Sequence, residues 1–413
     1  MEREELTAWL RLAMTPGIGN DSARRLLAAF GLPQTIFEQG SAALRQVVTD
    51  RQASALAQEP PQLAEQLQAT LDWLAAGDDG PARRVVTLAD STYPPSLLAI
   101  DDPPLMLYLL GATGDEWPAR ALAMVGSRNP TPQGRLNAQQ FARAFAGAGL
   151  TVVSGLALGV DAAAHEGALE ASPQGAEAGG LLTIAVIGTG MDRVYPRQHR
   201  DLAHRIARHG LIVSEYPIGT PPLPANFPKR NRIISGLSGG TLVVEAALQS
   251  GSLITARMAL EQGKEVFAIP GSIHTVQSRG CHALIKQGAK LVESAQDVLE
   301  ELRWPAAGGS LPETPTARAA GRTGRARRTV QGDERSTPAP LQLDAFTAAT
   351  DSDASAAESG LLQALGFDPV SFDALQARTG LSTPDLQAQL LELELDGRVG
   401  RLPGGLFQRI AQA

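Results

Sequence analysis

Short apolar segments alternate with helical patterns in the middle of the chain. The segments are ALAMVGS, LTVVSG, LLTIAVIG, GLIVSE, GTLVVEA and KEVFAIPG, which begin at residues 121, 150, 181, 210, 240 and 264. Because they are apolar on both faces and are separated by stretches of helical period, they predict a mostly parallel sheet that helices cover on both sides. The predicted core is therefore a Rossmann-like, doubly wound α/β domain that binds its ligand where the strands end.

A different pattern occupies residues 1–78. Stretches rich in Ala, Leu and Gln predict several short helices, in a SAM-like or helix-hairpin-helix-like domain. The turn Thr15–Gly19 separates the first two helices, and the exposed amides of such a Gly-rich turn can face a phosphate. A tight turn within a small helical bundle is the alternative, and the acidity of this region favours it. The core domain, residues 79–300, then begins with an extended connector over residues 79–118, whose prolines impose turns.

The C-terminal part of the chain contains two regions of different composition. Residues 301–356 are rich in Pro, Ala, Gly, Thr and Ser and have no apolar period, which predicts a disordered linker. Residues 357–413 contain three helical patterns followed by a Gly-rich ribbon, the layout of a winged helix. The third helix, expected over residues 383–396, contains no Lys or Arg, and only Gln387 and Gln389 could address base edges. We therefore favour a protein contact over DNA reading for this module.

Cysteine content and the distribution of apolar residues predict a cytoplasmic protein. The single cysteine, Cys281, excludes an intramolecular disulfide and a Cys-based zinc site, and it fits a reducing compartment. The chain starts with acidic residues where a signal peptide needs a basic flank, and no stretch approaches ~18 uninterrupted apolar residues. No membrane segment is expected.

The charge distribution directs a polyanion to the middle of the chain. The formal net charge is −7, which taken alone argues against nucleic-acid binding. Residues 119–300, however, contain 17 Lys and Arg against 13 Asp and Glu, whereas the segments on both sides are acidic. An anionic partner should therefore meet the middle segment.

Two turns at strand ends could bind phosphate groups. Gly126, Ser127 and Arg128 follow the first predicted strand, and Thr131-Pro132 then supply a helix cap and a first helical residue, so free amides point near a cation. Ser154-Gly155 makes a second such turn. In both cases the alternative is a glycine that the turn itself requires.

Asp161 and His165 lie one helical turn apart. Their spacing suggests a hydrogen-bonded structural pair, because no nucleophile accompanies them for catalysis.

The segment from Phe227 to Arg232 is the densest cation cluster of the middle region. It contains Lys229, Arg230 and Arg232 beside an aromatic ring. Single strands bind to this combination, because cations follow the phosphates while a ring stacks on a base. Pro228 is expected to start a helix that places Lys229 and Arg232 on one face.

Five blocks of the core occur in a characteristic order. They read VGSRNPTPQG, SGLALGVDAAAHEGAL, VIGTGMDRVYPRQH, SEYPIGTPPLPANFPKRNRIISGLSGGTLVVEA and SGSLITARMALEQGKEVFAIPGS. Over about residues 80–295 they closely resemble the DNA-processing A (DprA/Smf) family. The resemblance implies a protein that binds single-stranded DNA, forms a homodimer through its core and delivers the RecA recombinase onto the strand during recombination and natural transformation.

The resemblance also implies DNA contacts at Arg128 and Lys229. Arg230 and Arg232 are weaker candidates, because one of them could pair with Glu215 or Glu245 inside the core.

Signatures of the common enzyme classes are absent from the sequence. The chain contains no P-loop, no Gly-x-Gly-x-x-Gly after the first strand and no Gly-x-Ser-x-Gly, so no enzyme activity and no cofactor are expected. The spacing of His204 and His209 does not suit a metal site. The alternative is a nucleotide-processing hydrolase, since SGGTLVVEA is similar to the Gly-Gly-x-Gly-Thr-x-x-Glu signature of phosphoribohydrolases. The chain departs from that signature, because Gly240 is followed directly by Thr241 and Glu245 lies four residues further on.

Overall fold

The computed structural model describes residues 2–76, 80–112, 116–171, 181–302, 360–365, 370–383, 386–387, 390, 393–394, 399–402 and 406–409. The chain divides into two compact units, one within residues 1–303 and the other within residues 304–409. The predicted linker lies outside the described residues except for its first two. Glu301 is the last residue of helix α14 (Ala295–Glu301), and Leu302 is the C-cap of that helix.

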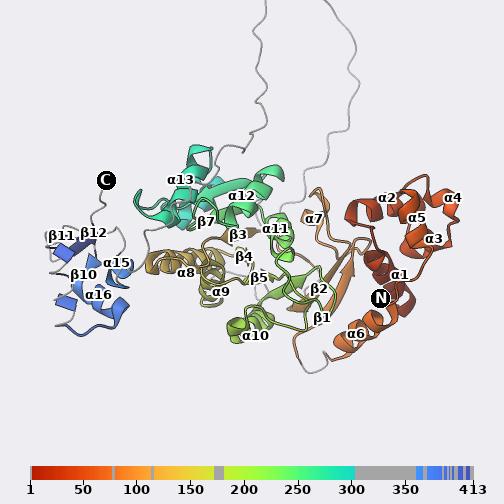
Figure 1. Ribbon diagram of the computed structural model, residues 1–413, viewed down its shortest axis with the longest axis horizontal. Helices are drawn as coiled ribbons and strands as arrows, with labels where there is room; N and C mark the ends of the chain where they lie inside the picture. The colour runs from red at the N-terminus through yellow and green to blue at the C-terminus, as the bar shows by residue number, and fades with distance from the viewer. Residues whose placement is uncertain are drawn as a thin grey trace, which may run out of the picture. The chain divides into compact units, whose positions relative to one another are not determined.

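Six short helices form the start of the first unit (Figure 1). They are α1 Arg3–Met14, α2 Asn20–Phe30, α3 Pro33–Glu38, α4 Ser41–Leu44, α5 Asp50–Leu56 and α6 Leu63–Ala75. Their apolar faces share one core that contains the fully buried Trp9 and extends to Met106 of the neighbouring sheet. The predicted turn after α1 is present: Gly17 has φ +80°, and its carbonyl accepts a hydrogen bond of 2.8 Å from Gln52 Nε2. This bond fixes the turn against α5.

A mostly parallel sheet forms the centre of the first unit. In the described residues it has nine strands in the order β1-β2-β6-β5-β4-β3-β7-β8-β9. The strands are β1 Arg83–Thr87, β2 Met106–Gly111, β3 Ala121–Val125, β4 Thr151–Ser154, β5 Thr183–Val186, β6 Leu211–Ser214, β7 Gly240–Val243, β8 Glu265–Ala268 and β9 Lys290–Leu291. The six predicted segments are the parallel strands β3 to β8, so the predicted Rossmann-like core is confirmed.

The predicted connector needs a correction. It contributes two strands, since β1 pairs antiparallel with β2 and β2 pairs antiparallel with β6. None of the connector's prolines lies within either strand, which is compatible with an added sheet edge.

Side chains of the central strands alternate between two buried cores. Ile184, Val186 and Val213 belong to one core, whereas Ala185 and Ile212 belong to the other. Each strand is therefore apolar on both faces, as a sheet covered on both sides requires.

Helices and 3₁₀ turns of the first unit supply the rest of both cores. Their bounds are α7 Pro95–Leu98, α8 Pro132–Gly147, α9 Val160–Leu169, η1 Arg197–His199, α10 Arg200–His209, α11 Asn226–Gly236, α12 Ser252–Glu261, η2 Val276–Ser278 and α13 Arg279–Lys286, followed by α14. None of the helices in the described part of the chain is long and apolar enough to cross a membrane.

The second unit has the predicted winged-helix composition of helices and a three-stranded sheet. It contains α15 Gly360–Leu365, β10 Val370–Ser371, α16 Phe372–Thr379, β11 Val399–Leu402 and β12 Leu406–Arg409, with strand order β10-β12-β11. Much of the predicted third helix lies outside the described residues. Its described members Leu386, Leu390 and Leu393 are buried in the small core at helical spacing.

A buried histidine lies under the parallel sheet. His165 of α9 is fully buried, and its Nδ1 is 2.7 Å from Thr183 Oγ1 of β5. Its Nε2 is buried without a hydrogen-bond partner among the described residues. Burial, with the nearby positive charges of His199 and Arg230, lowers the pKa of His165 from 6.5 to about 3.

We predict that this histidine makes the fold acid-sensitive. Between about pH 6.5 and pH 3 this histidine is protonated in the unfolded chain but neutral in the folded protein. The free energy of unfolding should therefore decrease as the pH is lowered through this window. The contribution is at most about 1.4 kcal/mol per pH unit. His165→Gln removes it, so the variant should show a shallower decline in denaturant titrations at pH 4 to 7. Parallel curves for the two proteins would show that His165 does not control the acid response.

Candidate nucleic-acid interface

A pocket of about 680 Å³ opens at the carboxyl edge of the sheet. Strands β4, β5 and β6 lie on one side of β3 and strand β7 lies on the other, so the strand order reverses between β3 and β7. Ligands of doubly wound sheets bind at this switch point. The lining comes from the loops after β3, β4 and β7, from the first turns of α9 and α12, from α11 and from the segment before η1, and includes Gly126, Ser127, Arg128, Ala157, Asp161, Tyr195, Phe227, Arg230, Asn231 and Ser250.

Close backbone packing fixes the turn that carries Arg128. A Cβ on Gly126 would lie 2.9 Å from the Glu245 carbonyl oxygen, and a Cβ on Gly159, which has φ +80°, would lie 2.4 Å from the Ser127 carbonyl oxygen. Only glycine fits at both positions. The Val160 amide also donates to the Ser127 carbonyl at 3.1 Å. The turn is therefore held from two sides, and the Arg128 side chain extends from a rigid base.

The helix after this turn begins as predicted. Thr131 caps α8, its Oγ1 accepting from the Gly134 amide at 3.0 Å, and Pro132 is the first helical residue. The Glu245 carboxylate accepts from the Thr131 amide at 2.9 Å and from its hydroxyl at 2.6 Å. Glu245 is thus a structural residue that holds the start of α8.

Arg230 is buried beneath the pocket and ties two strand ends together. Its Nη1 donates to the carbonyls of Gly155 and Val186, which lie at the ends of β4 and β5. Asp161 lies nearby and accepts from the amides of Gly155 and Ala157 at 3.1 and 3.3 Å. Burial raises the pKa of Asp161, while the charge of Arg230 and these hydrogen bonds act in the opposite direction. The buried cation is compensated by two carbonyls and a nearby carboxyl group.

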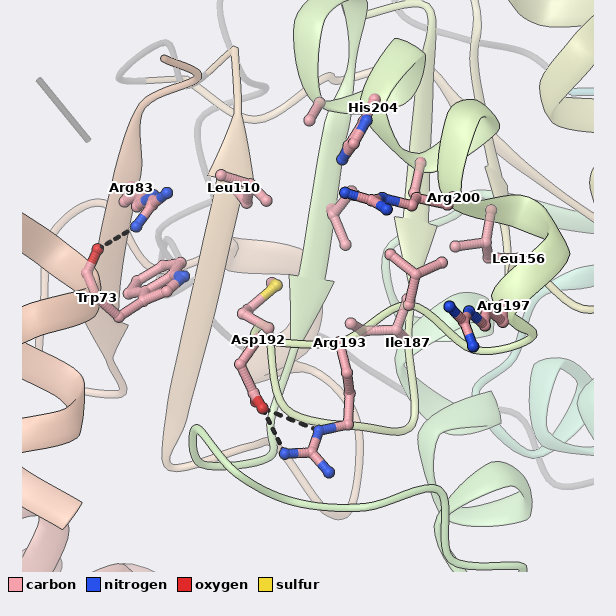
Figure 2. A pocket seen from close by; sticks show the side chains of 15 residues that line it. Trp73, Arg83, Leu110, Leu156, Ile187, Asp192, Arg193, Arg197, Arg200 and His204 are labelled. Atoms are coloured by element: carbon pink, nitrogen blue, oxygen red, sulfur yellow. Dashed lines mark hydrogen bonds and ion pairs between the residues drawn. The ribbon is translucent and has the colours of Figure 1, made fainter. Parts of the chain in front are cut away.

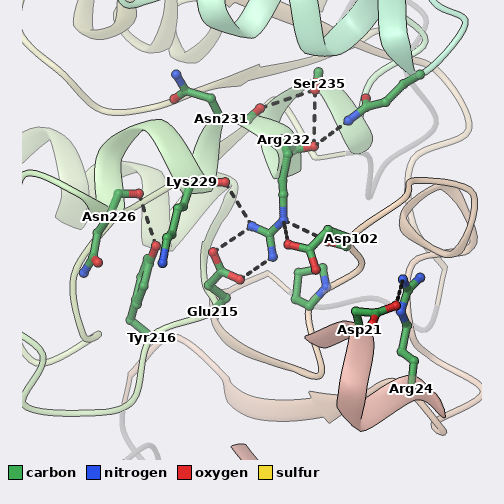
Figure 3. A network of polar contacts seen from close by, with 12 residues as sticks. Asp21, Arg24, Asp102, Glu215, Tyr216, Asn226, Lys229, Asn231, Arg232 and Ser235 are labelled. Atoms are coloured by element: carbon green, nitrogen blue, oxygen red, sulfur yellow. Dashed lines mark hydrogen bonds and ion pairs between the residues drawn. The ribbon is translucent and has the colours of Figure 1, made fainter. Parts of the chain in front are cut away.

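A second buried arginine, Arg232, connects α11 to two acidic residues, Glu215 and Asp102 (Figure 3). The Arg232 guanidinium donates to both carboxylate oxygens of Glu215 at 2.8 and 2.6 Å, and its Nε lies 2.9 Å from Asp102 Oδ2. The Arg232 side chain is only 11% exposed. The expectation that one cluster arginine pairs with Glu215 or Glu245 is confirmed for Arg232 with Glu215. Arg232 is therefore not available for DNA.

Two aromatic rings lie at the mouth of the pocket. The centroids of Tyr195 and Phe227 are 5.4 Å apart with an interplanar angle of 37°, and Tyr195 is 50% exposed. Tyr195 was missed at the level of sequence, although the block VIGTGMDRVYPRQH contains it, because nothing local places residue 195 beside residue 227.

The structure brings together only part of the predicted DNA-binding set. Gly126, Ser127, Arg128, Phe227 and Arg230 line the pocket. Lys229 is exposed on α11 and does not line it.

Four of the other sequence predictions are corrected. Ser154 is fully buried and its hydroxyl donates to the Met124 carbonyl, so it cannot reach a ligand. Gly155 is covered by Arg230, whose Nη2 occupies the space of a Cβ there. Asp161 and His165 form no pair, because each is bonded to a different neighbour. Helix α11 also begins at Asn226, two residues before Pro228.

The fold and the site define a Rossmann-like protein with a cationic, partly aromatic pocket at the switch point of its sheet. The chain belongs to the DNA recombination-mediator protein A family, whose model matches residues 84–303, and the DprA winged helix domain matches residues 345–405. The predicted DprA/Smf resemblance is confirmed.

Individual relatives support this membership. Protein Smf of Escherichia coli (strain K12) is 36% identical over 411 residues, covering 98% of this chain and 96% of the relative. The DNA processing protein DprA of Streptococcus pneumoniae is 45% identical over 218 residues, covering 53% of this chain and 74% of the relative. The X-ray structure of DNA processing protein A from Streptococcus pneumoniae covers 73% of this chain and 98% of its own, with 35% identity and a TM-score of 0.53.

We predict that Arg232 stabilises the fold. Arg232→Ala leaves Glu215 buried without its partner, which should lower the free energy of unfolding by about 3 kcal/mol. The control is Arg135→Ala, which removes an exposed pair with Glu166 and should cost less than about 1 kcal/mol. Equal losses in denaturant titrations would show that the Arg232 network adds nothing beyond a surface ion pair.

Proposed function

We propose that the chain binds single-stranded DNA in the pocket at the switch point and delivers RecA recombinase onto the bound strand, acting as a binding protein and not as an enzyme. The observation that carries DNA binding is the placement of Arg128 and an aromatic pair around one opening. A cation can neutralise a phosphate while an exposed ring stacks on the adjacent base. The family membership supports a role in DNA processing, and the RecA step follows the family resemblance.

Shape favours a single strand over a duplex. The bases of a duplex are stacked inside a rigid cylinder, so they cannot reach the rings of Tyr195 and Phe227 inside a pocket of about 680 Å³. A flexible strand can turn its bases toward these rings.

The proposal includes a homodimer formed through the core. Six of the twelve exposed large hydrophobic side chains in the described residues lie between residues 248 and 291. They are Leu248, Ile254, Leu260, Ile273, Val276 and Leu291. We expect the dimer contact in this part of the core, because half of these exposed apolar side chains belong to it and association would remove them from water.

The hydrolase alternative is weaker. Its similarity to this chain depends on Glu245, and the Glu245 carboxylate caps α8 through Thr131. Release of a base from nucleoside monophosphates would favour this alternative, and its absence would favour the binding protein.

We predict that Arg128 and Lys229 each neutralise one phosphate. Alanine at either position should reduce the slope of log affinity against log salt by about 0.7, because one fewer counterion is released. Fluorescence anisotropy with labelled oligo-dT at several salt concentrations measures this slope. Arg143→Ala is the control, because Arg143 is exposed like Lys229 but lies toward the C-terminal end of α8, whereas both chain neighbours of Lys229, Pro228 and Arg230, line the pocket.

Two outcomes would contradict the proposal. If Arg128→Ala and Lys229→Ala both keep the wild-type slope of log affinity against log salt, the DNA binds at another site. Equal affinity of the wild type for single strand and blunt duplex at ~0.15 M salt would remove the argument from shape.

We predict that the Tyr195 ring stacks on a base. Tyr195→Ala should weaken oligo-dT binding by about 1 to 3 kcal/mol, whereas Tyr195→Phe should retain wild-type affinity because stacking needs only the ring. The same salt series should show an unchanged slope for both variants. Loss of affinity in Tyr195→Phe would show that the hydroxyl, and not the ring, makes the contact.

A further inference from the structure

A second pocket, of about 450 Å³, lies on the α10 side of the sheet. Its walls come from α6, from strands β1, β2 and β6, and from the segment that leads into α10. Figure 2 shows Trp73 and Arg83 on one wall and Arg197, Arg200 and His204 on the other. All of these elements belong to the first unit.

The second pocket is strongly cationic. Four arginines and one aspartate line it, and Asp192 is already paired with Arg193. Arg83 donates to the Trp73 carbonyl, and among the described residues no acidic side chain forms an ion pair with it. Within the described part of the chain, no hydrogen bond or ion pair engages the exposed side chains of Arg197 and Arg200.

The fold does not explain this concentration of charge. Arg197 and Arg200 lie at the N-terminal end of α10, where the helix dipole disfavours cations. On α10, the residues that line the pocket are Arg200, Ala203, His204 and Ala207, which form one helical face. Arg205 and Arg208 are also exposed but do not line the pocket. The pocket face therefore carries cations that an anionic ligand would stabilise.

The floor of the second pocket is apolar. It contains Leu110, Leu156, Ile187, Met191 and Ile212. An anion that fits this pocket must present a negatively charged part to the arginines and an apolar part to the floor. A nucleotide within a single strand has this division between phosphate and base.

Two short segments contribute neighbouring residues to the two pockets. Leu156 lines the second pocket and Ala157 lines the first, and Val194 and Tyr195 divide in the same way. His199 Nδ1 lies 2.9 Å from the Leu156 carbonyl oxygen, which joins these segments. Arg197 of the second pocket follows the exposed Tyr195 of the first pocket by only two residues, so a strand that continues past the Tyr195 ring in this direction meets Arg197.

We propose that the second pocket is a further subsite for the same DNA strand, in which Arg197 and Arg200 bind phosphates and the apolar floor receives a base. This inference rests on the proposed function of the first pocket. It assigns a role to cations that lie outside that pocket, and it makes the total affinity depend on strand length.

The test compares two double variants on the full chain with labelled oligo-dT of about 6 and about 30 nucleotides. Arg197→Ala/Arg200→Ala removes the second-pocket cations. The control Arg205→Ala/Arg208→Ala removes two positive charges from the same helix outside the pocket. It measures the effect on affinity of lowering the net charge alone. On the long strand the pocket variant should bind about tenfold more weakly than the control, with a salt slope lower by about 1.4, and on the short strand the two should bind equally.

The outcomes separate the two proposals. Equal affinities of the two double variants on both strands, while Arg128→Ala still weakens binding, would overturn the second subsite alone. A loss that is the same on the short and the long strand would also overturn it, because the effect would then not depend on reaching a second pocket. Failure of the wild type to bind either strand would overturn both proposals.

Discussion

The candidate interface depends on one buried cation, the guanidinium of Arg230. A charge inside a protein is tolerated only if polar groups surround it, and Arg230 is surrounded by the carbonyls of Gly155 and Val186 and by the nearby Asp161. Gly155 directly follows β4 and Val186 ends β5, so one side chain of α11 bonds two strand ends at the carboxyl edge and lies near the acid of α9. Gly155 must lack a side chain because the guanidinium occupies that space. The base of the first pocket is therefore defined by a polar contact and not by apolar packing.

The same arrangement has an electrostatic consequence for the pocket. Burial lowers the pKa of Arg230, and the charge of Arg128 lowers it further. Two cations thus lie close together, and Asp161, the acid that compensates Arg230, lines the pocket but is only 7% exposed. An anion that binds beside Arg128 on its solvent side attracts both guanidinium groups, and this attraction offsets the repulsion between Arg128 and Arg230. Such a site favours a phosphate over a neutral ligand of the same shape.

Sequence patterns predicted the features that depend on near neighbours. The strands β3 to β8 followed from runs that are apolar on both faces, and the cap at Thr131 followed from a Thr-Pro pair after a strand. Features that depend on distant contacts were missed or misassigned. Arg230 and Arg232 are nearly equivalent in the sequence, yet one is held by two strand ends and the other by Glu215 and Asp102.

Long-range contacts also explain the other misassigned residues. Asp161 and His165 have the spacing of a pair, but Asp161 accepts from loop amides and His165 is bonded to Thr183. Tyr195 lies 32 positions from Phe227, so only the fold brings the rings together.

The N-terminal helices contribute to a cationic pocket, which their sequence did not indicate. Their acidity argued against DNA contact, and the Gly17 carbonyl in the turn between α1 and α2 is bonded to Gln52. Trp73 of α6, however, forms part of the second pocket, where Arg83 lies 5.6 Å from its ring. The bundle therefore supplies a wall for a basic pocket although it is itself acidic. Under the proposed function, the acidic residues of the bundle repel the DNA strand and restrict it to the cationic edge of the sheet.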